Sequence, residues 1–285
     1  MKNKCILKCV LFALVAFNSL AIMAQTTQQA AKPEKKFLQP ERVRYDGSCM
    51  TIEGKDIFIY SAAFHYFRCP EELWRDRFRQ IKEAGFNTVE TYVPWNWHER
   101  IMPSGLNDNS HFDFSDVKRW LKMAQEEFGL YTIVRPGPFI CAEYSGGGYP
   151  RWLAKFCPGG MDDFWLRSAD HRHISWSQHW FDAVCKALAD EQITRKPVGE
   201  KGIILIQIEN EYNHHGCYGK EKLLKALYQS IRKSGMDIPI FTCLTNECRS
   251  SEDVELSQVF DSDNYYVGLS SAPVSACRMA NTSKE

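Results

Sequence analysis

The apolar run from Gly202 to Ile208, which ends in Glu209, Asn210 and Glu211, constrains the fold of this chain most strongly. Aliphatic residues follow the glycine up to Gln207, and this pattern is typical of a strand that is buried on both faces. In an α/β barrel the catalytic groups lie at the C-terminal ends of such strands, so we expect chemistry at Asn210 and Glu211. An alternative is that an acid after an apolar run is only the first solvated residue of a loop.

Strands and helices are predicted to alternate along the rest of the chain. A hairpin is expected at residues 43–52, strands at 57–61, 86–92, 130–134, 203–208, 240–243 and 259–261, and helices at 70–84, 115–127, 175–190 and 220–234. This alternation predicts an α/β fold, a (β/α)8 TIM barrel. A closed barrel needs eight strands, so we expect a barrel truncated after about six strands, in a fragment of a longer protein. Alternatively, two strands lie inside the long segment 139–174.

The N-terminus has the features of an export signal. Lys2, Lys4 and Lys8 precede an apolar run, and small residues end at Ala24, which predicts a signal peptide at residues 1–24. The apolar run is shorter than the roughly 20 residues that a membrane anchor needs. Residues 25–38 are predicted to be a disordered leader, and residues 39–285 a partial TIM-barrel catalytic domain. We therefore expect an exported protein, periplasmic or extracellular, without a membrane span.

Charge and cysteine usage exclude several other functions. The formal net charge is zero, so nucleic acid is not an expected partner. Nine of the eleven cysteines follow the signal peptide, and they form no Cys-x-x-Cys pair or zinc-binding spacing. His214 and His215 are adjacent loop residues, which rarely converge on one ion. We predict no metal and no cofactor.

Polar residues follow four of the predicted strands, where the carboxyl ends of parallel strands meet. They are His65 and Tyr66, then residues 90–95, then Arg135 and Glu143, and finally Asn210 and Glu211. Acids, amides and aromatic rings on one rim suit the cleavage of sugars. Glycoside hydrolysis uses two carboxyl groups, one of which protonates the leaving oxygen while the other attacks or activates water.

Five segments resemble the glycoside hydrolase family 35 β-galactosidases. They are AFHYFR at 63–68, LWRDR at 73–77, GFNTVETYVPWNWHE at 85–99, RPGPFICAE at 135–143 and QIENEY at 207–212. The resemblance covers the chain from about His65 to Tyr212, in the family's order. It implies a retaining exo-β-galactosidase, and the expected partner is a galactose-terminated oligosaccharide or polysaccharide.

The resemblance also implies a role for individual residues. Glu211 matches the general acid/base, and Asn210 matches the residue that binds the sugar 2-hydroxyl group. The positions that match contacts to galactose are Tyr92, Cys141, Ala142 and Glu143. Glu209 is expected to be a supporting acid; the alternative is a structural role, an ion pair with an arginine behind the strand.

The chain departs from the family pattern in three ways. Asn213, His214 and His215 stand where the family usually has a Gly after Asn-Glu-Tyr. Tyr144 stands where the family usually has Trp, which leaves the linkage preference open. The family's nucleophilic Glu follows the seventh strand; neither Glu247 nor Glu252 has that position, and we assign no nucleophile. We hypothesise that this chain alone is inactive and poorly folded. The alternatives are another exo-β-glycosidase on the same scaffold, such as a β-glucosaminidase, and a carbohydrate-binding fragment without catalysis.

Overall fold

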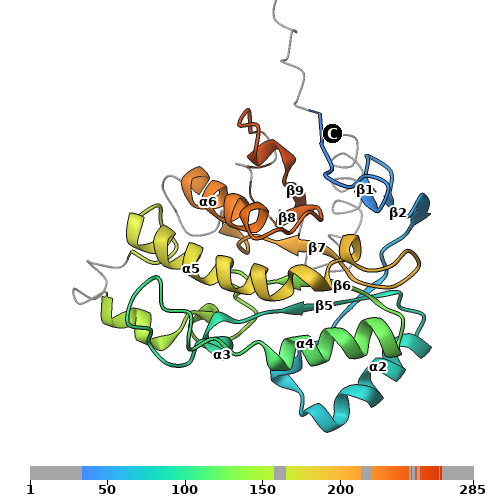
Figure 1. The fold of residues 1–285 in the computed structure, drawn as a ribbon, viewed down its shortest axis with the longest axis horizontal. Coiled ribbons are helices and arrows are strands. Elements are labelled where there is room, and N and C mark those ends of the chain that lie inside the picture. Colours follow the sequence, from blue (N-terminus) through green and yellow to red (C-terminus); the bar gives the residue numbers. More distant parts are fainter. Residues whose placement is uncertain are drawn as a thin grey trace, which may run out of the picture. The chain divides into compact units, whose positions relative to one another are not determined.

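A parallel sheet of six strands forms the centre of the structure, a computed structural model (Figure 1). It describes residues 34–156, 165–212, 220–243, 245, 248, 251–262 and 264. The strands are β4 (Ser61–Ala63), β5 (Thr88–Tyr92), β6 (Tyr131–Arg135), β7 (Ile203–Gln207), β8 (Ile240–Cys243) and β9 (Phe260–Ser262). Each strand pairs in parallel with the next strand in the sequence.

This strand order confirms the predicted α/β class and the TIM-barrel arrangement. In such a barrel, strands that follow each other in the sequence lie side by side and run in the same direction. Within the described residues β4 and β9 have a neighbouring strand on one side only. The segment 139–174, considered as a place for two further strands, contains no strand in its described parts, 139–156 and 165–174.

A three-stranded antiparallel sheet precedes the barrel strands. It consists of β1 (Val43–Tyr45), β2 (Met50–Ile52) and β3 (Lys55–Ile57). Asp46 forms the first turn, because its Oδ1 accepts the N–H groups of Ser48 and Cys49. The hairpin prediction is therefore confirmed, with one more strand.

The first barrel strand was predicted at residues 57–61, which is too early. Ile57 is already paired with Met50 in the antiparallel sheet. The Asn87 side chain then binds the next residues, donating to the Phe58 carbonyl at 2.7 Å and accepting from the Tyr60 N–H at 3.0 Å. Because these contacts are remote in sequence, the apolar run alone did not indicate that the strand begins at Ser61.

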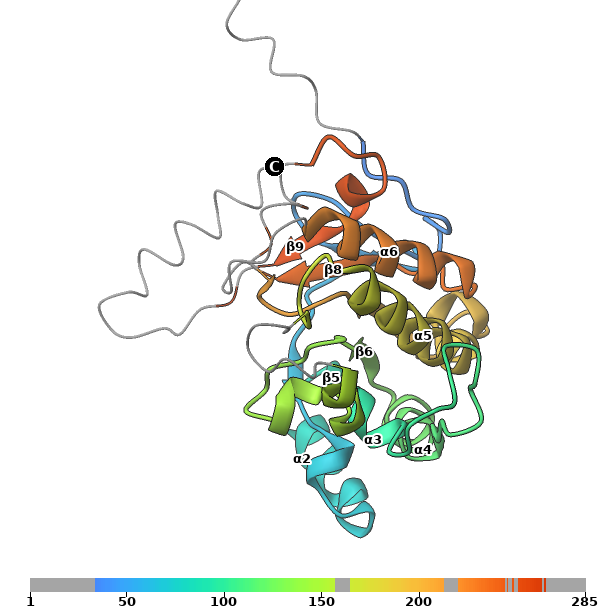
Figure 2. The same ribbon diagram turned by 90° about the vertical axis from the view of Figure 1, so that its left-hand side faces the viewer.

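The helices cover the sheet in two groups (Figures 1 and 2). One group contains α2 (Trp74–Glu83) and α4 (Ser115–Lys122), and α4 continues as a π-helical turn over Met123–Glu127. The other group contains α5 (His171–Leu188) and α6 (Lys220–Lys233), which pack side by side. The short helix α3 (Trp95–His98) follows β5, and 3-10 turns lie at Tyr66–Arg68, Glu71–Leu73, Ser145–Gly148, Arg151–Phe156, Ala189–Glu191, Ile193–Arg195 and Leu256–Gln258.

Helix α5 begins four residues before its predicted start. Asp170 is its N-cap, and its side chain accepts the backbone N–H of Arg172 at 2.8 Å. A side-chain oxygen at this position satisfies one of the unpaired N–H groups of the first turn. The sequence prediction missed this start, because His171 and His173 interrupt the apolar pattern that predicts a helix.

An aromatic layer fills the space between the sheet and the helices. Trp95 and Trp180 are fully buried and stack with ring centroids 5.9 Å apart. Trp180 also donates its indole N–H to the Pro136 carbonyl at 2.8 Å. The contact joins α5 to the chain that leaves β6, so the core also positions the C-terminal edge of the sheet.

Three predictions concern the N-terminus and the membrane. The predicted signal peptide and most of the leader lie outside the described residues. Residues 34–38 are described, form no helix or strand, and place the Lys35 ammonium group against the carbonyl groups of Ser257 and Val259. In the part of the chain that the structure describes, no helix is long and apolar enough to cross a bilayer.

Replacement of Gly202 by Ala tests the packing at the start of β7. A Cβ atom there would lie 2.6 Å from the backbone N and 2.7 Å from the Cα of Ile193, so backbone must move. We expect Gly202→Ala to lower the free energy of unfolding by about 1–3 kcal/mol in denaturant titrations. Gly105→Ala is the control, because no atom lies within 4 Å of its added Cβ. Equal stability of both variants would contradict the close approach.

Candidate functional site

The backbone adopts the left-handed conformation at two residues just after β7. The N–H of Ile208 still bonds to the Phe241 carbonyl at 2.9 Å, and the N–H of Glu209 bonds to the Gly137 carbonyl at 2.7 Å. Glu209 and Glu211 then have positive φ angles of 52° and 50°. Side chains other than glycine rarely adopt this conformation, which is concentrated at functional sites. The residues at the end of β7 are therefore held by their surroundings in a strained turn.

Arg135 links three strands at this edge of the sheet. Its guanidinium group donates to Glu90 Oε1 at 3.1 Å, to Asn210 Oδ1 at 3.0 Å and to Gln207 Oε1. It also lies 4.2 Å from the centroid of the Tyr92 ring. Side chains from the ends of β5, β6 and β7 thus form one connected group, as the positions of these residues in the sequence predict.

The hydrogen bonds around Asn210 fix the orientation of its amide. Oδ1 accepts from Arg135 and lies 3.5 Å from the Cys243 sulfur. Burial raises the pKa of the Cys243 thiol, which keeps this group a neutral S–H donor. No described residue accepts a hydrogen bond from the Asn210 amide nitrogen. This nitrogen can therefore donate to a ligand.

Glu211 lies beside Asn210 and is half-buried. Its Oε1 accepts a hydrogen bond of 2.8 Å from Asn264 Nδ2, and its backbone N–H points to the Cys243 sulfur at 3.4 Å. Cys243 is buried and also lies 3.3 Å from the side-chain nitrogen of Gln207. One sulfur atom therefore contacts the Gln207 side chain, the Asn210 side chain and the Glu211 backbone.

Glu209 has a different environment from Glu211, although the two are separated by one residue. It is fully buried and forms an ion pair of 2.8 Å with Arg167. Arg167 also donates to the Asn210 carbonyl at 2.6 Å, and the Asn210 N–H bonds to Glu209 Oε2 at 3.0 Å. Burial raises the pKa of Glu209, and the Arg167 charge opposes this shift. The predicted ion pair with an arginine is confirmed.

A buried histidine positions the backbone of Arg167. His173, in the first turn of α5, lies 2.8 Å from the Ser168 carbonyl through Nδ1 and 2.8 Å from the Tyr149 hydroxyl through Nε2. Burial lowers the pKa of His173 to about 4, so the neutral ring donates from Nδ1 and accepts at Nε2. The Arg167 N–H lies 3.4 Å from the same Nε2. Helix α5 is thereby connected to the turn after β7.

The segment after β6 contains the other predicted contacts to a sugar. Cys141, Ala142 and Glu143 have consecutive positive φ angles of 55°, 53° and 45°. Arg68 donates a hydrogen bond to the Ala142 carbonyl, which joins this segment to the loop after β4. Cys141 and Glu143 are exposed. Strain at three successive residues indicates that the surrounding structure, rather than local preference, sets this turn.

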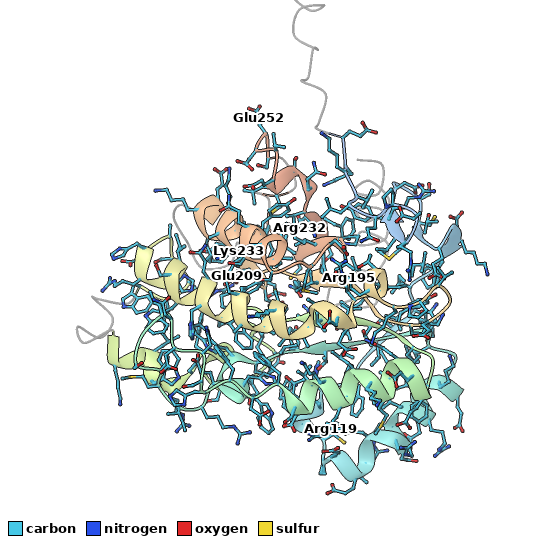
Figure 3. The ribbon with its side chains drawn as sticks, in the orientation of Figure 1. Arg119, Arg195, Glu209, Arg232, Lys233 and Glu252 are labelled. Atoms are coloured by element: carbon cyan, nitrogen blue, oxygen red, sulfur yellow. The ribbon has the colours of Figure 1, made fainter. Side chains whose placement is uncertain are left out.

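The structure brings together only part of the predicted site. Tyr92, Asn210 and Glu211 belong to one network through Arg135 and Cys243. Among the described contacts, none joins Cys141, Ala142 or Glu143 directly to Asn210 or Glu211. His214, His215 and Glu247 lie outside the described residues. Glu252 is exposed at the periphery of the fold, whereas Glu209 is fully buried (Figure 3).

Several residues of this network were absent from the sequence prediction. Cys243 is the last residue of a predicted strand, so its place at the C-terminal edge of the sheet could have indicated a site residue. Arg167 and Asn264 gave no local signal, because each reaches the site from a segment without periodicity. In the described part of the chain, no three His, Cys, Asp or Glu side chains form a group that could hold a metal ion.

Comparison with known proteins gives matches over most of the chain. The family model described as "Glycosyl hydrolases family 35" matches residues 49–284. "Beta-galactosidase-1-like protein 3" of Homo sapiens is 36% identical over 190 residues, which are 65% of this chain and 26% of that protein. "Exo-beta-D-glucosaminidase" of Pyrococcus horikoshii is 40% identical over 124 residues, which are 41% of this chain and 15% of that protein. The chain thus spans about a quarter or less of these relatives.

One solved structure shows the same fold. The crystal structure of a beta-galactosidase from the psychrophilic Marinomonas ef1 superposes with a TM-score of 0.51. The superposition covers 72% of this chain and 40% of that chain, at 9% sequence identity. At this identity the likeness supports the barrel arrangement and nothing finer.

Replacement of Arg167 by Met tests the role of the buried ion pair. The carboxylate of Glu209 would remain buried without its cation, and loss of one partner costs about 3–5 kcal/mol of unfolding free energy at neutral pH. Without Arg167 the pKa of Glu209 in the folded state rises further above its unfolded value. The folded state then holds the proton more tightly, so the loss of stability becomes smaller as the pH falls towards the unfolded pKa.

Denaturant titrations at about pH 7.5 and pH 5 measure this effect. The matched control is Arg79→Met, since Arg79 forms exposed ion pairs with Asp76 and Glu83 on α2. Such exposed pairs contribute about 0–1 kcal/mol, so the control should change little at either pH. A loss that is the same at both pH values would contradict the assignment of the Arg167→Met effect to Glu209.

Proposed function

The chain belongs to glycosyl hydrolases family 35, and on this basis we propose that it contributes the acid/base half of a retaining exo-β-galactosidase site. The substrate would be a glycan with a terminal β-linked galactose. The observation that carries this proposal is the pair of neighbouring residues Asn210 and Glu211 at the C-terminal end of β7. Asn210 has its amide oxygen fixed by Arg135 and Cys243, and Glu211 is half-buried beside it.

The contrast between the two glutamates supports Glu211 as the acid/base. A group that gives and takes a proton must be reached by the substrate. Glu209 is fully buried and held by Arg167, so it cannot meet a glycosidic oxygen without loss of the ion pair. Glu211 is accessible and keeps one carboxyl oxygen on Asn264, which leaves Oε2 for the leaving oxygen.

Asn210 suits the binding of a sugar hydroxyl group. Its carboxamide oxygen is taken by Arg135, so its nitrogen is the atom that would bind the 2-hydroxyl group of galactose. A hydrogen bond at this hydroxyl strengthens as the transition state forms. In the same proposal Tyr92, Cys141, Ala142 and Glu143 contact the galactose ring, with Glu143 as an acceptor for its hydroxyl groups.

A retaining mechanism also needs an attacking carboxylate, and we assign this role to no described residue. Two other glutamates of this network already have cationic partners: Glu90 lies 3.1 Å from Arg135, and Glu209 lies 2.8 Å from Arg167. In this proposal Glu211 first protonates the leaving oxygen, and later deprotonates the water that releases the sugar.

A β-glucosaminidase is the second candidate, because one relative carries the name exo-beta-D-glucosaminidase. The two sugars differ in the substituent at C2, next to which Asn210 would lie, and in the configuration at C4. A non-catalytic carbohydrate-binding role is the third candidate, and it does not require the carboxyl group of Glu211.

We also propose that residues 1–24 are a signal peptide and that residues 39–285 are part of the catalytic domain. Expression in a secreting bacterial host, followed by N-terminal sequencing of the exported product, should give Gln25 as the first residue. Retention of Met1 on the exported protein would refute cleavage at this position.

The activity test compares chromogenic β-galactosides and β-glucosaminides as substrates. Both would be given to this chain and to the chain extended through any reading frame that follows Glu285. We expect β-galactoside hydrolysis by the extended form, and a loss of about 10²–10⁴-fold in kcat for Glu211→Gln. Glu252→Gln is the matched control, because that carboxyl group is exposed at the periphery (Figure 3).

Each of the other outcomes selects a different candidate. Preference for the β-glucosaminide would favour the second candidate. If the protein binds galactose but hydrolyses neither substrate, and Glu211→Gln binds galactose equally well, the binding role would be favoured. Equal losses in Glu211→Gln and Glu252→Gln would remove the reason for assigning the acid/base to Glu211.

A further inference from the structure

The loops after β4, β5 and β6 carry a group of aromatic and cationic side chains, which we call the rim cluster. It consists of Phe67, Arg68, Trp97, Arg100 and Tyr144. Phe67 contacts Tyr144 with ring centroids 5.0 Å apart, and contacts Trp97 with centroids 6.4 Å apart. Since these loops follow the C-terminal ends of their strands, the rim cluster lies on the same side of the sheet as the proposed site.

A continuous series of ring contacts connects the rim cluster to Asn210. Arg135, which binds Asn210, stacks on Tyr92, and Tyr92 lies 5.2 Å from the His65 ring. His65 in turn stacks on Phe67 with centroids 5.4 Å apart. The rim cluster is therefore the outward continuation of the site and not a separate surface.

The rim cluster carries two positive charges. Arg68 lies 5.5 Å from the Phe67 ring and 5.9 Å from the Tyr144 ring, and Arg100 lies 4.6 Å from the Trp97 ring. Both arginines are exposed, and neither forms an ion pair with a carboxylate of the described residues. His65 adds no charge at neutral pH, because burial lowers its pKa to about 4. The adjacent acids are Glu143 and Asp116; Asp116 accepts the Trp97 indole N–H at 3.0 Å and is already paired with Arg119, so the positive charge is in excess.

The chemistry of these groups suits one class of ligand. Half-buried aromatic rings such as Trp97 and Tyr144 offer apolar faces on which the C–H face of a sugar ring can pack. Arg100 donates its Nε–H to the Trp97 carbonyl at 3.1 Å, and its two terminal NH2 groups can bind a carboxylate or a similar oxyanion through paired hydrogen bonds. The Tyr144 hydroxyl remains protonated, because burial raises its pKa, and it can donate as well.

We propose that the rim cluster binds an anionic sugar unit, either a uronic acid or a sulfated sugar, attached to the galactose that the site removes. This inference rests on the proposed galactosidase function and names the class of aglycone. Tyr144 and Trp97 would pack against the sugar ring, and Arg100 would bind its acidic group. Arg68 would add charge while it holds the Ala142 carbonyl.

Binding measurements with three disaccharides test the proposal. Each has a terminal β-galactose, linked to a neutral glucose, to a glucuronate or to a sulfated N-acetylglucosamine. In calorimetric titrations of this chain at low salt, the anionic ligands should bind roughly threefold to tenfold more tightly than the neutral one. The advantage should decrease at about 0.5 M salt, which screens exposed charges. Tighter binding of only one anionic ligand identifies the acidic group.

Two variants separate this effect from the general charge of the protein. Arg100→Gln should reduce the binding of the anionic ligands to within about twofold of the neutral one, and should leave binding of the neutral ligand unchanged. Arg195→Gln removes the same charge from the 3-10 turn before β7, at the opposite edge of the sheet (Figure 3). It should change none of the three affinities.

The outcomes distinguish failure of the subsite from failure of the proposed function. Equal affinity for the three disaccharides, or equal effects of Arg100→Gln and Arg195→Gln, would overturn the anionic subsite while the galactose site stands. If no disaccharide binds to this chain or to the form extended past Glu285, while circular dichroism shows that both are folded, the proposed galactoside function fails, and the subsite fails with it.

Discussion

One guanidinium group holds the functional edge of the sheet together. Arg135 bonds to Glu90 from β5 and to Gln207 and Asn210 at the end of β7, and it stacks on Tyr92. Parallel pairing in sequence order brings these strand ends to one edge, but it does not fix their side chains. Arg135 does so, because a planar group with several donors can orient several acceptors at once.

The turn after β7 shows how one strand end gives two glutamates different properties. Burial and the Arg167 ion pair remove Glu209 from solvent, while Glu211 stays half-buried with a hydrogen bond from Asn264. The left-handed backbone at both residues changes the direction of the chain between them. The difference therefore arises from the contacts of each side chain and not from residue type.

Sequence patterns predicted most of the fold because strands and helices follow local periodicity. The strands around β5 to β9 and the ion pair of Glu209 with an arginine were predicted, and the position of Asn210 and Glu211 followed from the end of β7. The start of β4 was not predicted, because it depends on hydrogen bonds from the Asn87 side chain, which is remote in sequence. Arg167 could not be named in advance, since its segment gains its conformation only from packing against α5.

The three left-handed residues at Cys141, Ala142 and Glu143 restrict how this protein can be diversified. Each residue with a side chain carries about 1–3 kcal/mol of backbone strain in that conformation, and branching at Cβ increases it. A library for directed evolution should therefore offer Gly, Asn and Asp at these positions and omit Val, Ile and Thr. New specificity is more accessible at Tyr144, whose backbone is extended and tolerates any side chain.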